Sequence, residues 1–208
     1  MSRPTCYRCH RPASACLCAR IKPVANQPEI IILQHPDEVR HAIGSAIIAD
    51  LSLQRCVRHV GEDFSSDDRI NRIIEQHGKD VFVVFPTRHA MSLSSFERHH
   101  ALDEQALGRY RFVFIDASWR KARKMWHLSS NLHRLPAIEL DGLGPSRYRI
   151  RKAPAPGLAS TLEAIVTLLS RLESAPDKYR PLLEVFDDMI DHQIQRMGKS
   201  VYRRNYGP

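Results

Sequence analysis

Short apolar runs recur along the chain and predict the strands of a sheet. Most of these runs show no strict alternation with polar residues, which is typical of strands that are buried on both faces of a parallel sheet. The five predicted strands cover residues 29–35, 55–60, 81–86, 110–116 and 137–140.

Segments with helical patterns separate these runs. Residues 37–53 carry an apolar side chain at every fourth position, which predicts one long helix. Residues 66–77 predict a second helix that Ser66 caps, and residues 160–172 and 177–196 predict two more. Because strands alternate with helices, we expect an α/β fold with a mostly parallel sheet flanked by helices, with ligands bound beyond the carboxyl ends of the strands.

The first eighteen residues contain four of the five cysteines, spaced as C-x2-C followed by C-x-C. Since disulfides are disfavoured in a reducing compartment, this spacing predicts a tetrahedral metal site with zinc as the expected ion. The predicted ligands are Cys6, Cys9, Cys16 and Cys18. Four thiolates leave no coordination position open, so the zinc has a structural role. The alternative is four reduced thiols without an ion.

The fifth cysteine, Cys56, stands alone near the start of a predicted strand. Free cysteines in such places are usually buried packing residues. We therefore expect Cys56 to be structural and not a nucleophile.

The chain has 208 residues and a formal net charge of +8, with 31 Lys and Arg against 23 Asp and Glu. This excess, which includes a basic tail over residues 199–204, fits a polyanionic partner. We find neither an apolar stretch long enough for a membrane span nor a signal peptide, so we expect a cytoplasmic protein without membrane contact. Glycine-rich phosphate-binding motifs of dinucleotide and P-loop enzymes are also absent.

Asp116 ends a predicted strand and is followed at once by a strongly basic helical segment over residues 119–126. An acid at the carboxyl end of a central strand is where an α/β fold places its chemistry. The alternative is that Asp116 or Ser118 caps the helix, with Trp119 and Trp126 in the core.

A second group of candidate residues lies in residues 146–161, where basic side chains precede a proline- and glycine-containing loop. Ser160 is followed three residues later by Glu163, a capping-box pattern for the next helix. The N-terminus of a helix binds phosphate or carboxylate groups well. The alternative is a solvated basic segment and an ordinary loop.

Taken together, these motifs resemble the DTW-domain family, whose bacterial members are tRNA-uridine aminocarboxypropyltransferases. The resemblance covers nearly the whole chain. The shared features are the four cysteines with Arg11 and Pro12, Leu33-Gln34-His35-Pro36-x-Glu38, Phe85-Pro86, Asp116-Ala117-Ser118-Trp119 with Ala122-Arg123-Lys124-Met125, and Tyr148-x2-Arg151 followed by Ser160-Thr161-x-Glu163-Ala164. The family usually has threonine at Ser118 and Asn-Thr at Gly44-Ser45, so a contact from the amide side chain at position 44 is in doubt here.

The resemblance implies a SPOUT-like fold with a C-terminal trefoil knot that holds S-adenosylmethionine. It also implies transfer of the 3-amino-3-carboxypropyl group to N3 of a tRNA uridine, in the variable loop, with release of 5'-methylthioadenosine. We accordingly divide the chain into an N-terminal four-cysteine zinc-binding lobe with its connector, residues 1–28, and a catalytic domain, residues 29–208. No obligate protein partner is implied.

By this resemblance, Asp116 is the candidate general base that takes the proton from uridine N3. The residues expected to contact the cofactor are Gln34, Ser45, Phe85, Pro86, Asp116, Leu140, Ser160 and Thr161. Trp119 is expected to stack on the target base or, alternatively, to pack in the core. The residues expected to contact tRNA are Trp119, Arg120, Lys121, Arg123, Lys124, Arg147, Arg149, Arg151, Arg203 and Arg204.

Two other functions stay open at this point. One is an RNA methyltransferase that uses S-adenosylmethionine on the same fold. The other is a non-enzymatic, zinc-containing RNA-binding module, which fits the charge and the cysteines without any reaction.

Overall fold

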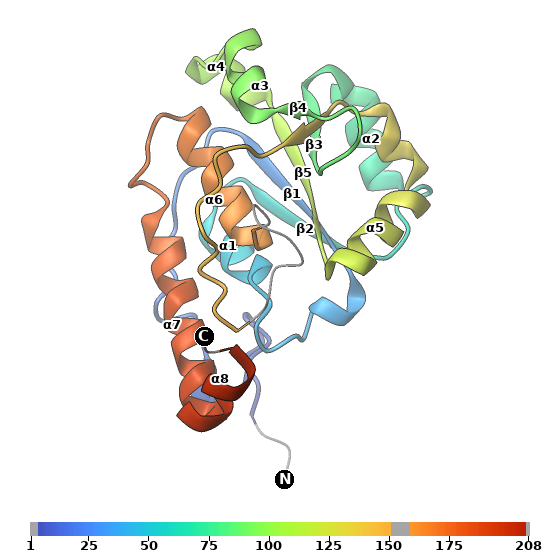
Figure 1. The fold of residues 1–208 in the computed structure, drawn as a ribbon. Coiled ribbons are helices and arrows are strands. Elements are labelled where there is room, and N and C mark those ends of the chain that lie inside the picture. Colours follow the sequence, from blue (N-terminus) through green and yellow to red (C-terminus); the bar gives the residue numbers. More distant parts are fainter. Residues whose placement is uncertain (1–3, 151–158, 207–208) are drawn as a thin grey trace.

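A computed structural model describes residues 4–150 and 159–206. Its centre is a sheet in which every strand pairs in parallel, with the order β2-β1-β5-β3-β6-β4 (Figure 1). The strands are β1 (Glu29–Gln34), β2 (Cys56–Val60), β3 (Val81–Val84), β4 (Met91–Ser92), β5 (Arg111–Asp116) and β6 (Ala137–Glu139). The five strands expected from the apolar runs are confirmed, and β4 is an additional edge strand.

The helices follow the alternating pattern expected of an α/β protein. Their bounds are α1 (Ala46–Ser52), α2 (Asp68–His77), α3 (Leu93–His99), α4 (Glu104–Arg109), α5 (Trp119–Leu128), α6 (Thr161–Leu172), α7 (Arg180–Met197) and α8 (Lys199–Tyr206). Short 3-10 helices are η1 (Ala13–Ala15), η2 (Pro36–Glu38), η3 (Gly78–Asp80) and η4 (Ser130–Arg134). The fold class is thus confirmed as α/β with a parallel sheet flanked by helices.

The single helix expected over residues 37–53 is wrong. The segment begins with η2, continues as a loop and becomes helical only in α1. Backbone carbonyls in the loop accept hydrogen bonds from distant side chains, as described below, instead of completing helical turns. Tertiary contacts therefore override the local pattern. The cap of α2 also differs, because the side chain of Asp67, not Ser66, accepts from the backbone N–H groups of Arg69 and Ile70.

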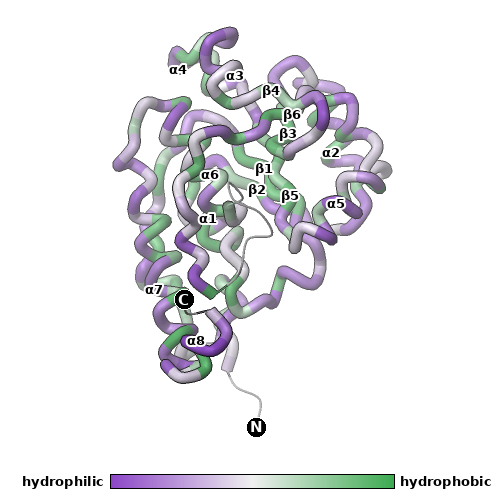
Figure 2. The backbone as a smooth tube through the Cα atoms, in the orientation of Figure 1, coloured by the Kyte–Doolittle hydropathy of each residue, from purple (hydrophilic) through white to green (hydrophobic). Residues whose placement is uncertain are grey.

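Each face of the sheet buries its own hydrophobic core, because successive side chains of a strand point to opposite faces. On β1, Ile30 and Ile32 pack against α1, α3, α6 and α7, whereas Ile31 and Leu33 pack against α2 and α5. The strands are among the most hydrophobic parts of the chain (Figure 2). The central strands are therefore buried on both sides, as their unbroken apolar runs predict.

The N-terminal segment packs onto the same molecule instead of standing apart. Cys9 and Leu17 are buried and belong to the core that contains α1 and α7. Arg20 adds an exposed ion pair with Asp188 of α7. The domain boundary at residue 28 stays a prediction.

No helix in the described part of the chain combines the length and apolar character that a membrane crossing needs. The predicted trefoil knot also stays a prediction. The C-terminal segment that would form it includes residues 151–158, which lie outside the described residues.

Candidate active site

The carboxyl ends of β1 and β5 meet at one edge of the sheet, because the two strands are parallel neighbours. Gln34 is the last residue of β1 and Asp116 the last of β5, and they are paired residues in the register. Two side chains that are far apart in the sequence are thereby brought together. The position is the one that α/β folds use for ligands.

Both carboxylate oxygens of Asp116 accept hydrogen bonds from protein side chains. Gln34 Nε2 donates to Oδ2 at 2.7 Å, and Thr161 Oγ1 donates to Oδ1 at 2.6 Å. Asp116 is only 7% exposed. These two donors help to fix the orientation of the carboxylate.

Arg58 and Asp50 determine which way the side-chain amide of Gln34 faces. Arg58 Nη1 donates to Gln34 Oε1 at 2.6 Å, and Arg58 Nε donates to Asp50 Oδ2 at 2.8 Å. Because the amide oxygen is occupied by Arg58, the amide nitrogen is directed to Asp116. Sequence reasoning missed Arg58 and Asp50, since neither lies in a recognisable motif.

Thr161 is the first residue of α6, and the start of this helix is held by a complete capping box. Ser160 Oγ accepts from Glu163 N, and Glu163 Oε2 accepts from Ser160 N at 2.9 Å. Glu163 also accepts from Ser146 Oγ at 3.0 Å and from Arg147 N at 2.6 Å. The predicted capping box is confirmed, and its glutamate also anchors residues 146 and 147.

A cavity of about 120 Å³ lies against Asp116, between the carboxyl ends of β3 and β5 and the N-terminal ends of α5 and α6. Among the residues expected to contact a cofactor, those that line it are Ser45, Phe85, Pro86, Asp116, Ser160 and Thr161. Gln34 is not among the described lining residues of this cavity; it donates to Asp116 and lines the larger cavity described below. Leu140 packs against the hydrophobic core and is not among the described lining residues.

Both charged residues in the described lining of this cavity are acidic. Its charged residues are Glu38 and Asp116, and it includes no lysine or arginine. The remaining lining is apolar or carries hydroxyl groups, as from Ser45, Tyr148 and Thr161. An acidic, partly apolar cavity favours a ligand that carries positive charge and an apolar or aromatic portion.

The loop that precedes Ser45 is held by side chains that are distant in the sequence. Arg11 donates to the carbonyl oxygens of Ala42 and, at 2.9 Å, of Gly44, while the Tyr148 hydroxyl donates to the carbonyl of Ile43. Arg11 is 5% exposed, and burial lowers the pKa of its guanidinium group. The backbone carbonyls of three consecutive residues, Ala42, Ile43 and Gly44, thus accept hydrogen bonds from side chains outside the loop.

A second cavity of about 520 Å³ lies between the cysteine-containing lobe, residues 38–44 and α7. It shares Glu38 and Gly44 with the first cavity, so the two meet at these residues. Its described lining contains four arginines, Arg11, Arg20, Arg40 and Arg196, and three acids, Glu38, Asp188 and Asp191. Positive and negative charges therefore nearly balance in the larger cavity, whereas both charged residues in the described lining beside Asp116 are acidic.

Trp119 combines the two roles that the sequence left open. It is half-buried, lies 6.4 Å from Phe85 between ring centroids, and also lines the cavity beside Asp116. Trp126 stacks on Phe85, with 5.4 Å between the ring centroids, and is not among the described residues that line the cavity. Trp119 thus has one side in the packing and another available to a ligand.

The basic residues of α5 divide into paired and unpaired groups. Lys121 pairs with Asp37 at 2.7 Å, and Lys124 pairs with Glu62 at 2.9 Å. Arg120 and Arg123 are exposed and form no ion pair within residues 4–150 and 159–206. The two arginines are the more available to a phosphate backbone.

The other predicted tRNA contacts lie on separate elements. Arg147 pairs with Asp187 at 2.5 Å, and Arg149 pairs with Asp191 at 2.8 Å. Arg203 and Arg204 are exposed on α8, which lies well away from α5 in Figure 1. Arg151 lies outside the described residues. The predicted tRNA contacts that the structure describes therefore do not form one patch.

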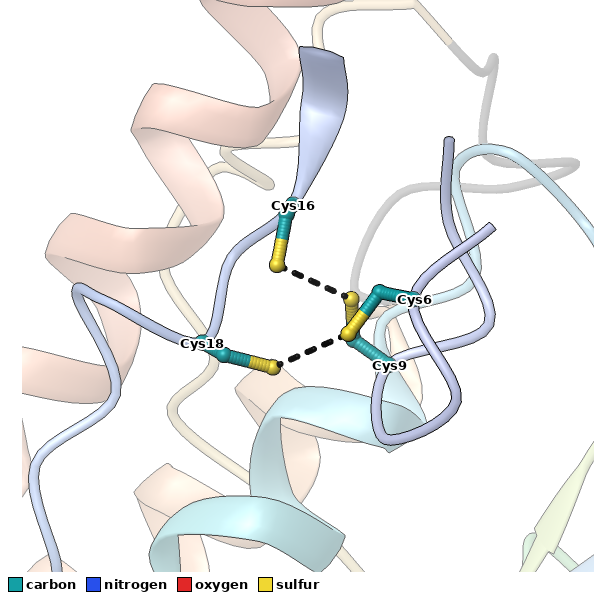
Figure 3. A group of neighbouring side chains, drawn as sticks. All are labelled: Cys6, Cys9, Cys16 and Cys18. Atoms are coloured by element: carbon teal, nitrogen blue, oxygen red, sulfur yellow. Dashed lines mark hydrogen bonds between the residues drawn. The ribbon is translucent and has the colours of Figure 1, made fainter. Parts of the chain in front are cut away.

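The four cysteines of the N-terminal segment converge on one point (Figure 3). Their Sγ atoms all lie within 4.8 Å of one another, with 3.7 Å between those of Cys6 and Cys18 and 3.8 Å between those of Cys9 and Cys16. Tetrahedral Zn–S bonds of about 2.3 Å would place sulfur atoms about 3.8 Å apart. The geometry is therefore suited to a tetrahedral metal ion.

The thiols of this cluster differ in acidity before any ion binds. Backbone N–H groups of Cys9 and Arg8 lower the pKa of Cys6 to about 6, whereas burial and neighbouring thiols raise the pKa of Cys18 to about 12. A bound cation favours the thiolate form at every ligand. Cys56 is half-buried against the core, and burial raises the pKa of its thiol, which fits the predicted structural role.

Comparison with known proteins agrees with the resemblance seen in the motifs. The chain is 31% identical over 199 residues to tRNA-uridine aminocarboxypropyltransferase 2 of Drosophila melanogaster, a match that covers 92% of this chain and 76% of the relative. The enzyme of the same name from Mus musculus is 29% identical, with 98% and 70% covered, and tRNA-uridine aminocarboxypropyltransferase A of Arabidopsis thaliana is 25% identical, with 92% and 81% covered. No solved structure gives a significant match. The DTW domain model matches residues 3–194, and the chain belongs to the DTW domain family.

Proposed function

We propose that this protein is a tRNA-uridine aminocarboxypropyltransferase. It moves the 3-amino-3-carboxypropyl group of S-adenosylmethionine to N3 of a tRNA uridine, in the variable loop, and releases 5'-methylthioadenosine. The family and the names of the relatives support the reaction. The observation that carries the proposal is the acidic cavity, which gathers Asp116 and most of the expected cofactor residues in one place.

The charge of the cavity supports S-adenosylmethionine as the donor. This molecule carries a sulfonium and an ammonium group against one carboxylate, so it suits a lining with two acidic and no basic described residues. The residues that would hold it are Ser45, Phe85, Pro86, Ser160 and Thr161. When bound, it supplies an electrophilic methylene group next to its sulfonium, with a neutral thioether as the leaving group.

In this reaction Asp116 accepts the proton of uridine N3. The protonated nitrogen is a poor nucleophile, and a carboxylate within hydrogen-bond reach removes the proton as the N3–carbon bond forms and the carbon–sulfur electron pair leaves with sulfur. Gln34 and Thr161 hold the carboxylate in one orientation for this step. Accurate positioning supplies much of the acceleration in such a displacement.

The tRNA is bound through exposed cations and, at the target base, through Trp119. Its half-exposed ring beside the cavity is placed to stack on a base that leaves its normal position. Arg120 and Arg123 supply the nearest unpaired positive charges, on the same helix. Lys121, Lys124, Arg147, Arg149, Arg151, Arg203 and Arg204 complete the proposed contacts.

The ion at the cysteine cluster is proposed to be zinc, with a structural role. We expect about one zinc per chain by elemental analysis of protein purified without chelator. Replacing the exposed ligand Cys16 with serine should lower the zinc content by most of that amount. The matched variant Cys56→Ser should keep it, and equal zinc content in all three proteins would contradict the proposal.

We also propose that the sheet is part of a SPOUT-like knotted fold, as family resemblance implies, and that the protein acts in the cytoplasm. A reducing compartment keeps four neighbouring cysteines reduced and thus available to a metal ion. Cytoplasmic tRNA is also the substrate that the proposed reaction needs.

Mass spectrometry of tRNA treated with the purified protein and S-adenosylmethionine tests the proposed reaction. We expect a gain of about 101 Da on one uridine, the mass of the transferred group, with an equal amount of methylthioadenosine released. A gain of about 14 Da would instead identify a methyltransferase. Tight tRNA binding with neither product would identify an RNA-binding module.

A further inference from the structure

Glu38 is a buried carboxylate to which the proposed reaction gives no role. It is the last residue of η2 and is only 8% exposed. Unlike Asp116, its carboxylate makes no hydrogen bond or ion pair with any described residue. Its oxygens are not among the fully enclosed unpartnered atoms of the described residues, and they border the two cavities. A carboxylate with no protein partner that faces a cavity is a candidate ligand-binding group.

The position of Glu38 connects it to both cavities. It lines the cavity beside Asp116 and the larger cavity against the cysteine-containing lobe, and so stands where the two meet. The buried arginine of the larger cavity's described lining, Arg11, donates to the carbonyls of Ala42 and Gly44 and to the Met189 sulfur. Arg11 therefore supports the loop and does not neutralise Glu38.

We propose that Glu38 binds the α-ammonium group of S-adenosylmethionine, an inference that rests on the proposed function. The aminocarboxypropyl group must face the incoming uridine, and we place its ammonium group where the two cavities share Glu38 and Gly44 in their linings. A buried carboxylate without a partner favours a cation with several donors over the neutral N3–H of uridine. Glu38 then selects the amino-acid end of the donor, while Asp116 serves the nucleophile.

Calorimetric titration with three ligands separates this role from a general effect on the cavity. S-adenosylmethionine carries both the ammonium group and a sulfonium charge, and methylthioadenosine lacks both. S-adenosylhomocysteine keeps the amino-acid tail on a neutral thioether, so Glu38→Gln should weaken its binding as much as that of S-adenosylmethionine if Glu38 binds the ammonium group. With Glu38→Gln we expect affinity for S-adenosylmethionine to fall about 10- to 100-fold. Affinity for methylthioadenosine should change by less than about 2-fold.

Two further variants make the measurement specific. Glu38→Asp keeps the charge, so it should lose less affinity for S-adenosylmethionine than Glu38→Gln. Asp37→Asn removes the same charge one residue away, where the side chain is 66% exposed and pairs with Lys121 outside the cavity. It should leave all three affinities unchanged.

Several results would overturn the inference. If Glu38→Gln bound S-adenosylmethionine with unchanged affinity, the inference would be wrong. If this variant nevertheless transferred the group more slowly, Glu38 would act on the uridine instead. An equal loss of affinity for all three ligands would mean general damage to the cavity. The proposed function has its own test. It would be contradicted if the wild-type protein did not increase the mass of tRNA by about 101 Da, independently of how Glu38→Gln affects binding.

Discussion

Replacing Asp116 with asparagine is expected to lower the rate of aminocarboxypropyl transfer by about 100- to 10,000-fold, the usual contribution of a general base. The substitution removes the group proposed to accept the proton of uridine N3. Because the chemical step loses its proton acceptor, the fall should appear in kcat and in single-turnover rates at saturating S-adenosylmethionine, with little change in the affinity for tRNA. Loss of one of the two acids in the described cavity lining should also weaken binding of the cationic donor, so saturation is required.

The fold should tolerate this change, since the hydrogen bonds from Gln34 and Thr161 each have a replacement. The asparagine oxygen can accept from Gln34 Nε2, and its amide nitrogen can donate to the Thr161 hydroxyl, which accepts as readily as it donates. Thermal unfolding should therefore change little. Loss of activity could then not be attributed to unfolding.

Rapid mixing of enzyme, donor and tRNA, followed by quantification of the modified uridine, measures the effect. Glu75→Gln is a suitable control, because it neutralises an exposed carboxylate on α2 that is not part of the cavity lining. It should transfer at the wild-type rate. Undiminished single-turnover transfer by Asp116→Asn would exclude Asp116 as the base.

The position of Asp116 could be predicted from the sequence, but its partners could not. An apolar run that ends in an acid predicts a strand with its carboxylate at the ligand-binding edge. The contact with Gln34 depends on β1 and β5 being neighbours, which the order of elements along the chain does not show. The contribution of Arg58 depends in addition on β2 being on the other side of β1.

The loop before α1 shows a different limit of sequence reasoning. Apolar side chains at every fourth position predicted a helix through residues 37–53, and only α1 forms. The carbonyls of Ala42, Ile43 and Gly44 are instead bound by Arg11 and Tyr148, which are distant in sequence. The same packing buries Glu38. The sequence placed Glu38 in a recognisable motif, but it could not predict that the Glu38 carboxylate has no side-chain partner among the described residues.

Arg11 connects the cysteine-containing lobe to this loop, and its removal should be the most destabilising change outside the hydrophobic core. Replacing Arg11 with methionine leaves the carbonyls of Ala42 and Gly44 without their charged donor, while the new side chain fills part of the space. Hydrogen bonds to charged groups contribute more than neutral ones. We expect the free energy of unfolding to fall by about 2–4 kcal/mol.

Urea unfolding of the metal-loaded protein measures this loss, and Arg20→Met provides the matched control. Arg20 belongs to the same lobe, but its ion pair with Asp188 is exposed, at 58% and 47% for the two side chains, so its removal should cost less than about 1 kcal/mol. Both variants keep the four cysteines and should keep their metal. If the two substitutions destabilised the protein equally, Arg11 would not be the connection between the lobe and the wall of the active-site cavity. A larger loss of unfolding free energy for Arg11→Met than for Arg20→Met would show that this lobe stabilises the loop before α1 through one buried guanidinium group.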